Sequence, residues 1–260
     1  MKNVTSKDGT KITYDQLGQG APVVLVSGGS VDKGSNASLA EALAPHFTVY
    51  NYDRRGRGES GDTQPYAVDR EIEDIEAVID AAGGKAYLYG SSSGAALALE
   101  AARKLPTKVT KLVMWEPPYI MDPARRPAAN TAQIFSDFIA AGKRAEAAEH
   151  FMAKVVGLPP EFVEGARNSP WWPGQLALAH TLAYDATVMG DYSLPEARIA
   201  DVKVPTIVID GGASFGFMHE TADAIAKVLN DRGHRKTLEG QQHNVDGAVL
   251  GAAVTEFLNG

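Results

Sequence analysis

Residues 87–101, YLYGSSSGAALALEA, place three consecutive serines between two glycines, where an apolar run gives way to an alanine-rich run. The apolar run, Tyr87–Tyr89, is typical of a strand buried on both faces, and the alanine-rich run predicts a helix to about Arg103. The five residues between them fit the pattern G-x-S-x-G, with Ser92 in the central place. In a strand–turn–helix context this pattern predicts a nucleophilic serine. A glycine-rich junction without chemistry is the alternative, so residues elsewhere must decide.

Three other short runs are apolar throughout, as expected of strands that helices cover on both faces. They are Val23–Val26, Leu112–Trp115 and Thr206–Ile209. Between them, apolar residues recur at three- and four-residue steps, as in residues 68–82, which predicts amphipathic helices. Strand–helix alternation over residues 20–115 and 204–260 therefore predicts an α/β fold. The acidic residues of the 68–82 helix, from Glu71 to Asp80, are interpreted as its solvated face.

The beginning and the middle of the chain depart from this alternation. The opening segment, with Ile12 and Tyr14 on one face, predicts an antiparallel edge hairpin. From Pro117 to Pro195 no strand run occurs, and helical patterns are punctuated by prolines. An all-helical block between two parallel strands predicts a cap over the carboxyl edge of the sheet.

Composition and charge exclude several classes of function. The 32 acidic against 25 basic residues give a net charge of −7, which argues against nucleic acid and an anionic membrane surface as partners. The chain has no cysteine, which excludes disulfides, thiolate metal sites and cysteine nucleophiles. The six histidines lack metal-binding spacing, and no apolar segment reaches the length of a membrane span. We therefore expect a cytoplasmic protein with no metal, no cofactor and a small-molecule substrate.

The loops after two predicted strands carry further signals. Ser27–Ser30, SGGS, predicts a backbone N–H from Gly29 that points at a substrate oxyanion, with a plain β-turn as the alternative. The residue after the nucleophile, Ser93, would donate the second N–H. Residues 52–60, YDRRGRGES, contain three arginines. They are interpreted as a structural turn that Asp53 ties together, rather than as a phosphate site.

The order of these motifs resembles the cap-bearing type of the α/β-hydrolase superfamily. It runs VVLVSGG, YDRRGRGES, YGSSSG, a helical insert, PTIVIDGG and GQQH, and the match covers residues 10–116 and 196–260. The resemblance implies a mostly parallel, eight-stranded sheet with helices on both faces. Residues 1–116 and 196–260 would form this core, and residues 117–195 the helical cap. One departure is that members of the superfamily usually carry His-Gly after the third strand, where this chain has Ser27-Gly28.

One of the six histidines is expected to act as the catalytic base. His243 ends the segment LEGQQH, residues 238–243, after the last predicted strand. The chain order serine, acid, histidine then places it at the carboxyl edge of the sheet, within reach of Ser92. The other five are interpreted as structural or solvent-exposed: His46, His150, His180, His219 and His234.

The acid of the triad is harder to place. The usual position in the superfamily lies a few residues beyond the seventh strand, but residues 211–216, GGASFG, contain no carboxylate. Glu116 directly follows the strand Leu112–Trp115, and the prolines 117–118 hold it in a fixed turn. Some members of the superfamily, haloalkane dehalogenases among them, carry their acid after this strand. Asp210, at the end of the seventh strand, is the alternative acid.

These residues predict a carboxylesterase-like serine hydrolase that forms an acyl-enzyme with a small or medium hydrophobic ester, thioester or lactone. Ser92 would attack, His243 would transfer the proton, and Glu116 would orient the imidazole. Large side chains of the cap would line the pocket, namely Phe135, Phe138, Met152, Trp171, Trp172 and Tyr184. Asp185 and His180 could add polarity to it. The alternatives are a cofactor-free perhydrolase or carbon–carbon bond hydrolase with the same triad, and a non-catalytic small-ligand-binding module on the same fold.

Overall fold

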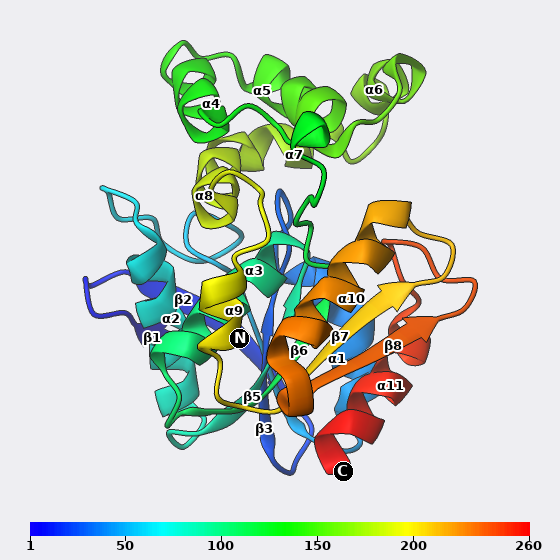
Figure 1. The fold of residues 1–260 in the computed structure, drawn as a ribbon. Coiled ribbons are helices and arrows are strands. Elements are labelled where there is room, and N and C mark those ends of the chain that lie inside the picture. The colour runs from blue at the N-terminus through cyan, green and yellow to red at the C-terminus, as the bar shows by residue number, and fades with distance from the viewer.

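Eight strands form one sheet in the order β1-β2-β4-β3-β5-β6-β7-β8 in the computed structural model, which describes residues 1–260 (Figure 1). The strands are β1 (Lys2–Thr5), β2 (Lys11–Leu17), β3 (Pro22–Val26), β4 (Thr48–Tyr52), β5 (Ala86–Ser91), β6 (Val109–Trp115), β7 (Thr206–Gly211) and β8 (Gly233–Leu238). β1, β2 and β4 pair antiparallel, and every neighbouring pair from β4 to β8 is parallel. The predicted edge hairpin and mostly parallel sheet are confirmed.

Helices cover both faces of this sheet. One face packs against α2 (Val68–Ala81), α3 (Ser93–Lys104), α9 (Glu196–Ala200) and α10 (Gly216–Leu229), and the other against α1 (Ala37–Leu43) and α11 (Gly247–Asn259). In β3, Val24 and Val26 join the first of these cores, whereas Val23 and Leu25 join the second. Successive strand residues point to opposite faces, so a strand covered on both sides must be apolar throughout.

Residues 117–195, between β6 and β7, form a separate helical layer beside the sheet, which we call the insertion (Figure 1). It contains α4 (Thr131–Ala140), α5 (Arg144–His150), a π-helical turn η3 (Phe151–Val156), α6 (Pro160–Arg167), α7 (Trp172–Leu178) and α8 (Leu182–Met189). Single 3₁₀ turns are η1 (Lys33–Asn36), η2 (Pro123–Arg125), η4 (Ala179–Thr181) and η5 (Asn230–Arg232). The insertion has two small apolar clusters of its own, one around Phe135 and Leu182 and one around Met152 and Ala166. No helix of the chain is both long and apolar enough to cross a membrane.

The arginine-rich segment after β4 is a structural turn, as predicted. The Asp53 carboxylate accepts hydrogen bonds from the N–H of Lys33 at 2.9 Å and from the N–H of Glu59 at 3.1 Å. The arginines at positions 54, 55 and 57 are buried. Buried guanidinium groups need carboxylate partners, and these partners come from other elements.

The interpretation of the acidic residues of α2 as a solvated face is wrong for two of them. Glu71 and Asp74 are buried. Arg54 donates to both oxygens of Glu71, and Arg55 to both oxygens of Asp74, at 2.7 Å in each case. These bidentate pairs hold the arginine turn against α2. Helical periodicity treats charged residues as solvent-facing and carries no information on partners 17 to 19 residues away.

Replacing Asp8 by asparagine is expected to lower the free energy of unfolding at neutral pH, and to have little effect near pH 2. Burial alone would raise the pKa of Asp8, but hydrogen bonds from Thr10 and Arg55 lower it from 3.8 to about 2. A carboxylate whose pKa falls on folding stabilises the fold above its unfolded pKa, and this contribution is lost as the pH falls through the folded pKa. Urea unfolding of both proteins across this range tests the prediction. A difference that does not change with pH would contradict it.

Candidate active site

Ser92 occupies the sharp turn between β5 and α3. Its φ of 55° lies in the left-handed region, which is strained for a residue other than glycine. The Ser92 N–H donates to the carbonyl of Trp115 at 2.8 Å, and the Ser92 carbonyl accepts from the N–H of Ala95 at 2.9 Å. This is the strand–turn–helix that the G-x-S-x-G pattern predicts, and it places Ser92 in the wall of a cavity.

The backbone around this turn leaves no space for a side chain at Gly90 or at Gly94. A Cβ at Gly94 would lie 2.3 Å from the carbonyl oxygen of Ser27, and a Cβ at Gly90 would lie 2.3 Å from the carbonyl oxygen of Gly94. Both approaches are too close for any carbon, so the turn requires glycine at these two positions.

Gly94→Ala is therefore expected to lower the free energy of unfolding by about 1–3 kcal/mol, because the backbone must move to accommodate the methyl group. Urea unfolding measures the change. Gly165→Ala in α6 is the control, since a Cβ there meets nothing within 4 Å and alanine favours a helix. If Gly94→Ala and Gly165→Ala change the free energy of unfolding in the same direction, the steric argument is wrong.

Glu116 and His243 form a carboxylate–imidazole pair at the carboxyl end of β6. The side chain of Glu116 is buried, and its Oε2 lies 2.5 Å from Nδ1 of His243. The same carboxylate accepts from the N–H of Gly211 at 2.8 Å and from the hydroxyl of Ser214 at 2.9 Å. Three contacts fix the carboxylate, and its bond to Nδ1 leaves Nε2 of the imidazole for another partner.

The backbone around His243 is tied to the same strand. The indole N–H of Trp115, the residue before Glu116, donates to the carbonyl of His243 at 3.1 Å. The His243 side chain remains 38% exposed, so its ring can reach both the buried carboxylate and the cavity. Chain order alone predicts that His243 lies at this edge of the sheet. The hydrogen bond from Trp115 is not predicted by the sequence and is seen only in the structure.

Asp210 lies in a different cluster. It is buried at the end of β7, where it contacts His219 Nδ1, a guanidinium nitrogen of Arg235 at 3.2 Å and the hydroxyl of Thr237 at 3.2 Å. The structure therefore brings Glu116, and not Asp210, to His243. None of the other five histidines lines the cavity that contains Ser92.

Two backbone N–H groups in the cavity wall beside Ser92 are candidates to bind an oxyanion. The Gly29 N–H makes no hydrogen bond, and Ser93 begins α3, whose first N–H groups lack intrahelical partners. Gly29 and Ser93 line the same cavity as Ser92. The structure thus brings both of the predicted oxyanion donors to the wall that carries the serine.

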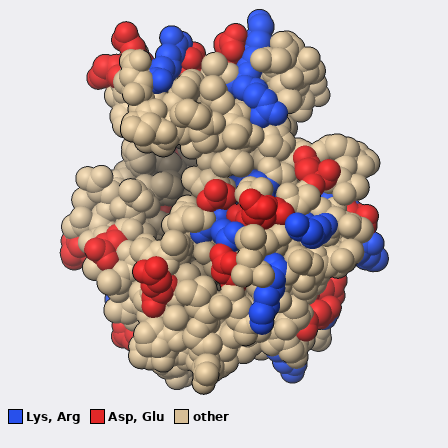
Figure 2. Space-filling model, turned by 180° about the vertical axis from the view of Figure 1, so that it is seen from behind, with Lys and Arg blue, Asp and Glu red and all other residues tan.

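The cavity has a volume of about 660 Å³ and lies between the core and the insertion. Viewed from behind, the molecule shows a recess between these two layers (Figure 2). Ser92, Trp115 and His243 line its core side. Its apolar side chains from the insertion and from the segment that begins α10 include Ile120, Phe151, Val155, Val156, Met189, Tyr192, Phe215, Phe217 and Met218. This size and this lining suit a small organic molecule.

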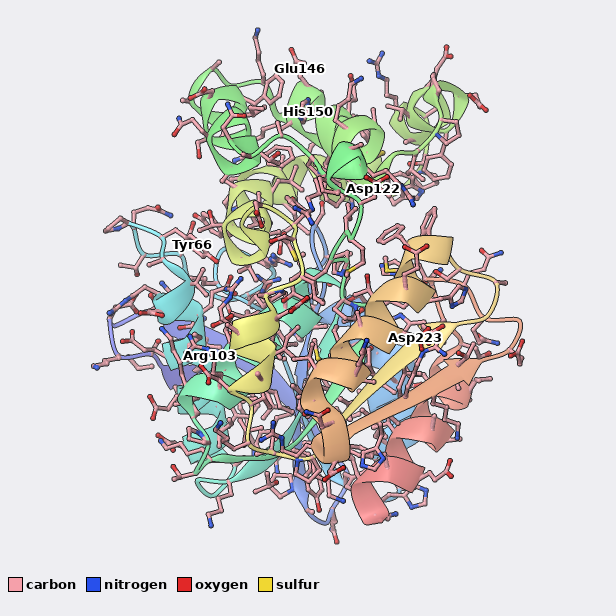
Figure 3. All side chains as sticks on the ribbon, viewed as in Figure 1. Tyr66, Arg103, Asp122, Glu146, His150 and Asp223 are labelled. Atoms are coloured by element: carbon pink, nitrogen blue, oxygen red, sulfur yellow. The ribbon has the colours of Figure 1, made fainter.

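The predicted pocket wall needs correction, because none of the six cap residues lines this cavity: Phe135, Phe138, Met152, Trp171, Trp172 and Tyr184. Phe135 packs inside the insertion, and Met152 does so in its second cluster. Tyr184 stacks on Tyr66, which lies below α8 in Figure 3, with ring centroids 4.0 Å apart. Trp171 is 46% exposed. Side-chain size alone does not predict the cavity wall, because Phe135 and Met152 pack against other helices of the insertion.

Two further polar residues contact the site: Ser214, to which the sequence assigns no role, and Asp185, which it names with His180 as a possible source of polarity in the pocket. The hydroxyl of Ser214 donates to Glu116, a contact that the sequence does not indicate because the G-x-x-D pattern expected after β7 predicts a carboxylate there and not a hydroxyl. Asp185 on α8 is buried and lines the cavity. Burial alone would raise the pKa of Asp185, but the guanidinium groups of Arg57 and Arg54 hold it below its ordinary value. Three arginines in one turn after a core strand are the sequence signal for such a carboxylate.

Comparison with known proteins identifies the family to which the chain belongs. A family model described as "Alpha/beta hydrolase family" matches residues 23–248. The chain belongs to the alpha/beta hydrolase family. The solved structure of an alpha/beta hydrolase from Sphaerobacter thermophilus DSM 20745 is 46% identical, with a TM-score of 0.91. That match covers 99% of this chain and 100% of the other.

Curated proteins match this chain over shorter stretches. An uncharacterized hydrolase, YraK, of Bacillus subtilis (strain 168) is 34% identical over 113 residues, which are 42% of this chain and 42% of that protein. An N-formylmaleamate deformylase of Pseudomonas putida (strain KT2440) is 36% identical over 112 residues, 42% of this chain and 41% of that protein. The chain thus matches less than half the length of these relatives, and hydrolases are among them.

Proposed function

We propose that this alpha/beta hydrolase is a serine hydrolase that cleaves a small or medium hydrophobic carboxylic ester, thioester or lactone. Ser92 is the nucleophile, His243 the general base and acid, and Glu116 the residue that orients the imidazole. The N–H groups of Gly29 and Ser93 form the oxyanion hole. The insertion, residues 117–195, acts as the cap that closes the substrate cavity.

The observation that carries this proposal is the Glu116–His243 pair beside the cavity that contains Ser92. A carboxylate bound to Nδ1 fixes the tautomer of the ring, so that Nε2 can accept a proton from a hydroxyl. No hydrogen bond joins Ser92 to His243 in this structure, and such bonds are often long before substrate binds. The strained turn at Ser92 is a second support, since strained backbone concentrates at functional sites.

The reaction follows from these positions. Oγ of Ser92 attacks the carbonyl carbon while Nε2 of His243 takes the hydroxyl proton, and the oxyanion receives hydrogen bonds from Gly29 and Ser93. The C–O or C–S bond to the leaving group then breaks as His243 returns the proton to it. Water attacks the acyl-enzyme by the same route, which releases the carboxylic acid and restores Ser92. Glu116 stays ionised throughout and stabilises the imidazolium.

The cavity supports the substrate class. Its volume of about 660 Å³ and its apolar lining match a ligand of modest size with one polar reacting group. The relative named as an N-formylmaleamate deformylase adds an N-formyl amide to the compounds worth testing. A panel of p-nitrophenyl esters of increasing acyl length, a thioester, a lactone and an N-formyl amide would rank these classes.

Labelling with a fluorophosphonate probe, followed by peptide mass spectrometry, tests the proposal without knowledge of the substrate. We expect a stoichiometric adduct on Ser92 that is lost in His243→Ala, because the probe requires an activated serine and an oxyanion hole. His219→Ala is the matched control, since His219 contacts Asp210 and does not line the cavity. No adduct on folded protein, together with tight binding of a small ligand, would favour the non-catalytic binding module instead.

A further inference from the structure

We propose that Asp185 is a positioning residue that holds both oxyanion donors in place and thereby couples the insertion to the reaction centre. The proposal rests on the function proposed above. Asp185 belongs to α8 of the insertion, yet its buried carboxylate lies against the loop after β3 and the start of α3. A group on the insertion therefore contacts, within the cavity wall, the two segments whose backbone N–H groups would bind the oxyanion.

The carboxylate of Asp185 contacts both donor segments directly. Its Oδ1 accepts from the hydroxyl of Ser93 at 2.8 Å, and its Oδ2 accepts from the N–H of Ser30 at 3.3 Å. A Cβ built on Gly29 would lie 3.2 Å from Oδ2, so the carboxylate is packed against that residue as well. One side chain thus fixes Ser93 and the residue next to Gly29.

Two arginines complete the support from the other side of the carboxylate. Arg54 donates to Oδ1 of Asp185 at 2.8 Å, and Arg57 donates to both of its oxygens at 2.8 and 2.9 Å. The same guanidinium groups donate to carbonyls of the loop after β3. Arg54 binds the carbonyl of Ser27 at 3.3 Å, and Arg57 binds the carbonyls of Gly28 and Val31.

The bond from Arg57 to the Gly28 carbonyl decides where the Gly29 N–H points. The Gly28 carbonyl and the Gly29 N–H belong to one planar trans peptide, so they point in opposite directions. Because the carbonyl faces the buried guanidinium, the N–H faces away from it, and it has no acceptor in the protein. Asp185 holds Arg57 in the position that imposes this orientation.

The charges of this network balance. Arg54 and Arg57 are matched by Glu71, which binds Arg54, and by Asp185, which binds both. Asp185→Asn would retain hydrogen-bonding groups near Ser93 and Ser30 but leave one buried positive charge in excess. We expect the guanidinium groups to shift and the 27–31 loop to lose its fixed orientation, with little change in the apolar wall that binds substrate.

The test measures the rate constant for phosphonylation of Ser92 by a fluorophosphonate, and kcat and KM for a p-nitrophenyl ester, in wild type and three variants. Asp185→Asn is expected to lower kcat and the phosphonylation rate by about 10²-fold, the effect of losing or misplacing one oxyanion donor, with KM changed less than about threefold. Ser93→Ala, which removes one contact to Asp185 but no charge, is expected to lower both by about tenfold. Asp74→Asn is the matched control, because it breaks an equally buried pair, with Arg55, that has no contact with the 27–31 loop.

The outcomes separate the two proposals. Equal kcat losses in Asp185→Asn and Asp74→Asn, or a loss confined to KM, would show that Asp185 only stabilises the fold and would overturn its positioning role. If Asp185→Asn does not fold, Ser93→Ala decides, and a wild-type phosphonylation rate in that variant overturns the proposal. Wild-type protein that takes no label overturns the proposed hydrolase function itself, and this inference with it.

Discussion

Ser92→Ala is expected to lower kcat for any ester substrate by on the order of 10⁶-fold, because the serine and the histidine of the proposed triad act as one unit. The fold should be unaffected, since alanine keeps the Cβ and the backbone bonds of the turn to Trp115 and Ala95. Hydrolysis of a p-nitrophenyl ester, with thermal unfolding measured on the same samples, tests both statements. Binding of a non-hydrolysable ester analogue should persist in the variant.

Ser91→Ala is the control for this experiment. Ser91 precedes the nucleophile, ends β5 and also lines the cavity, but no proposed step uses its hydroxyl. We expect its activity to remain within about tenfold of wild type. Residual activity of Ser92→Ala within the same range would show that Ser92 is not the nucleophile.

Glu116→Gln is expected to lower kcat by on the order of 10⁴-fold, as observed when the acid of such triads becomes an amide. Glutamine has one acceptor oxygen, which can keep the bond from the N–H of Gly211; its amide NH2 then takes the place of Oε2 and can donate to Nδ1 of His243, which favours the wrong tautomer. It also cannot stabilise the imidazolium. The loss should appear in kcat and not in KM, since Glu116 lies behind the histidine and does not line the cavity. Steady-state kinetics with one ester substrate measures this.

Asp210→Asn distinguishes the two acids that the sequence allowed. Asp210 is as deeply buried as Glu116 but contacts His219 and Arg235. The substitution is expected to affect stability far more than kcat. If Asp210→Asn lowered kcat and Glu116→Gln did not, the acid of the triad would be Asp210.

The buried strands, the turn at Ser92 and the position of Glu116 could be predicted from the sequence, because each depends on a short stretch of residues. A strand covered on both faces must be apolar throughout, and the turn at Ser92 needs glycine on both sides, so both features appear in short stretches. Glu116 could be located because two prolines follow the strand and end it. Each of these inferences depends on residues adjacent in the chain.

The cavity wall and the buried charges could not be predicted in this way. The periodicity of apolar residues shows which face of a helix is apolar, but not which element that face contacts. The sequence therefore predicts Phe135 and Tyr184 in the cavity wall, whereas both pack elsewhere. Glu71 and Asp74 have the pattern of surface residues, and only the fold brings the arginines to them. Asp185 lies 128 residues from Arg57, a separation across which no periodicity operates.

The hydrogen bond between Ser214 and Glu116 has a consequence for where the acid of the proposed triad can lie. Ser214 lies in the loop after β7, and its hydroxyl touches the carboxylate oxygen that binds His243. Side chains from the loops after two adjacent strands therefore meet at the carboxylate that binds the imidazole. A carboxylate introduced at position 214 would lie beside the oxygen that binds His243, so the loop after β7 could supply the acid of the proposed triad in place of Glu116. Moving that role from one strand to the next would then take substitutions at these two positions.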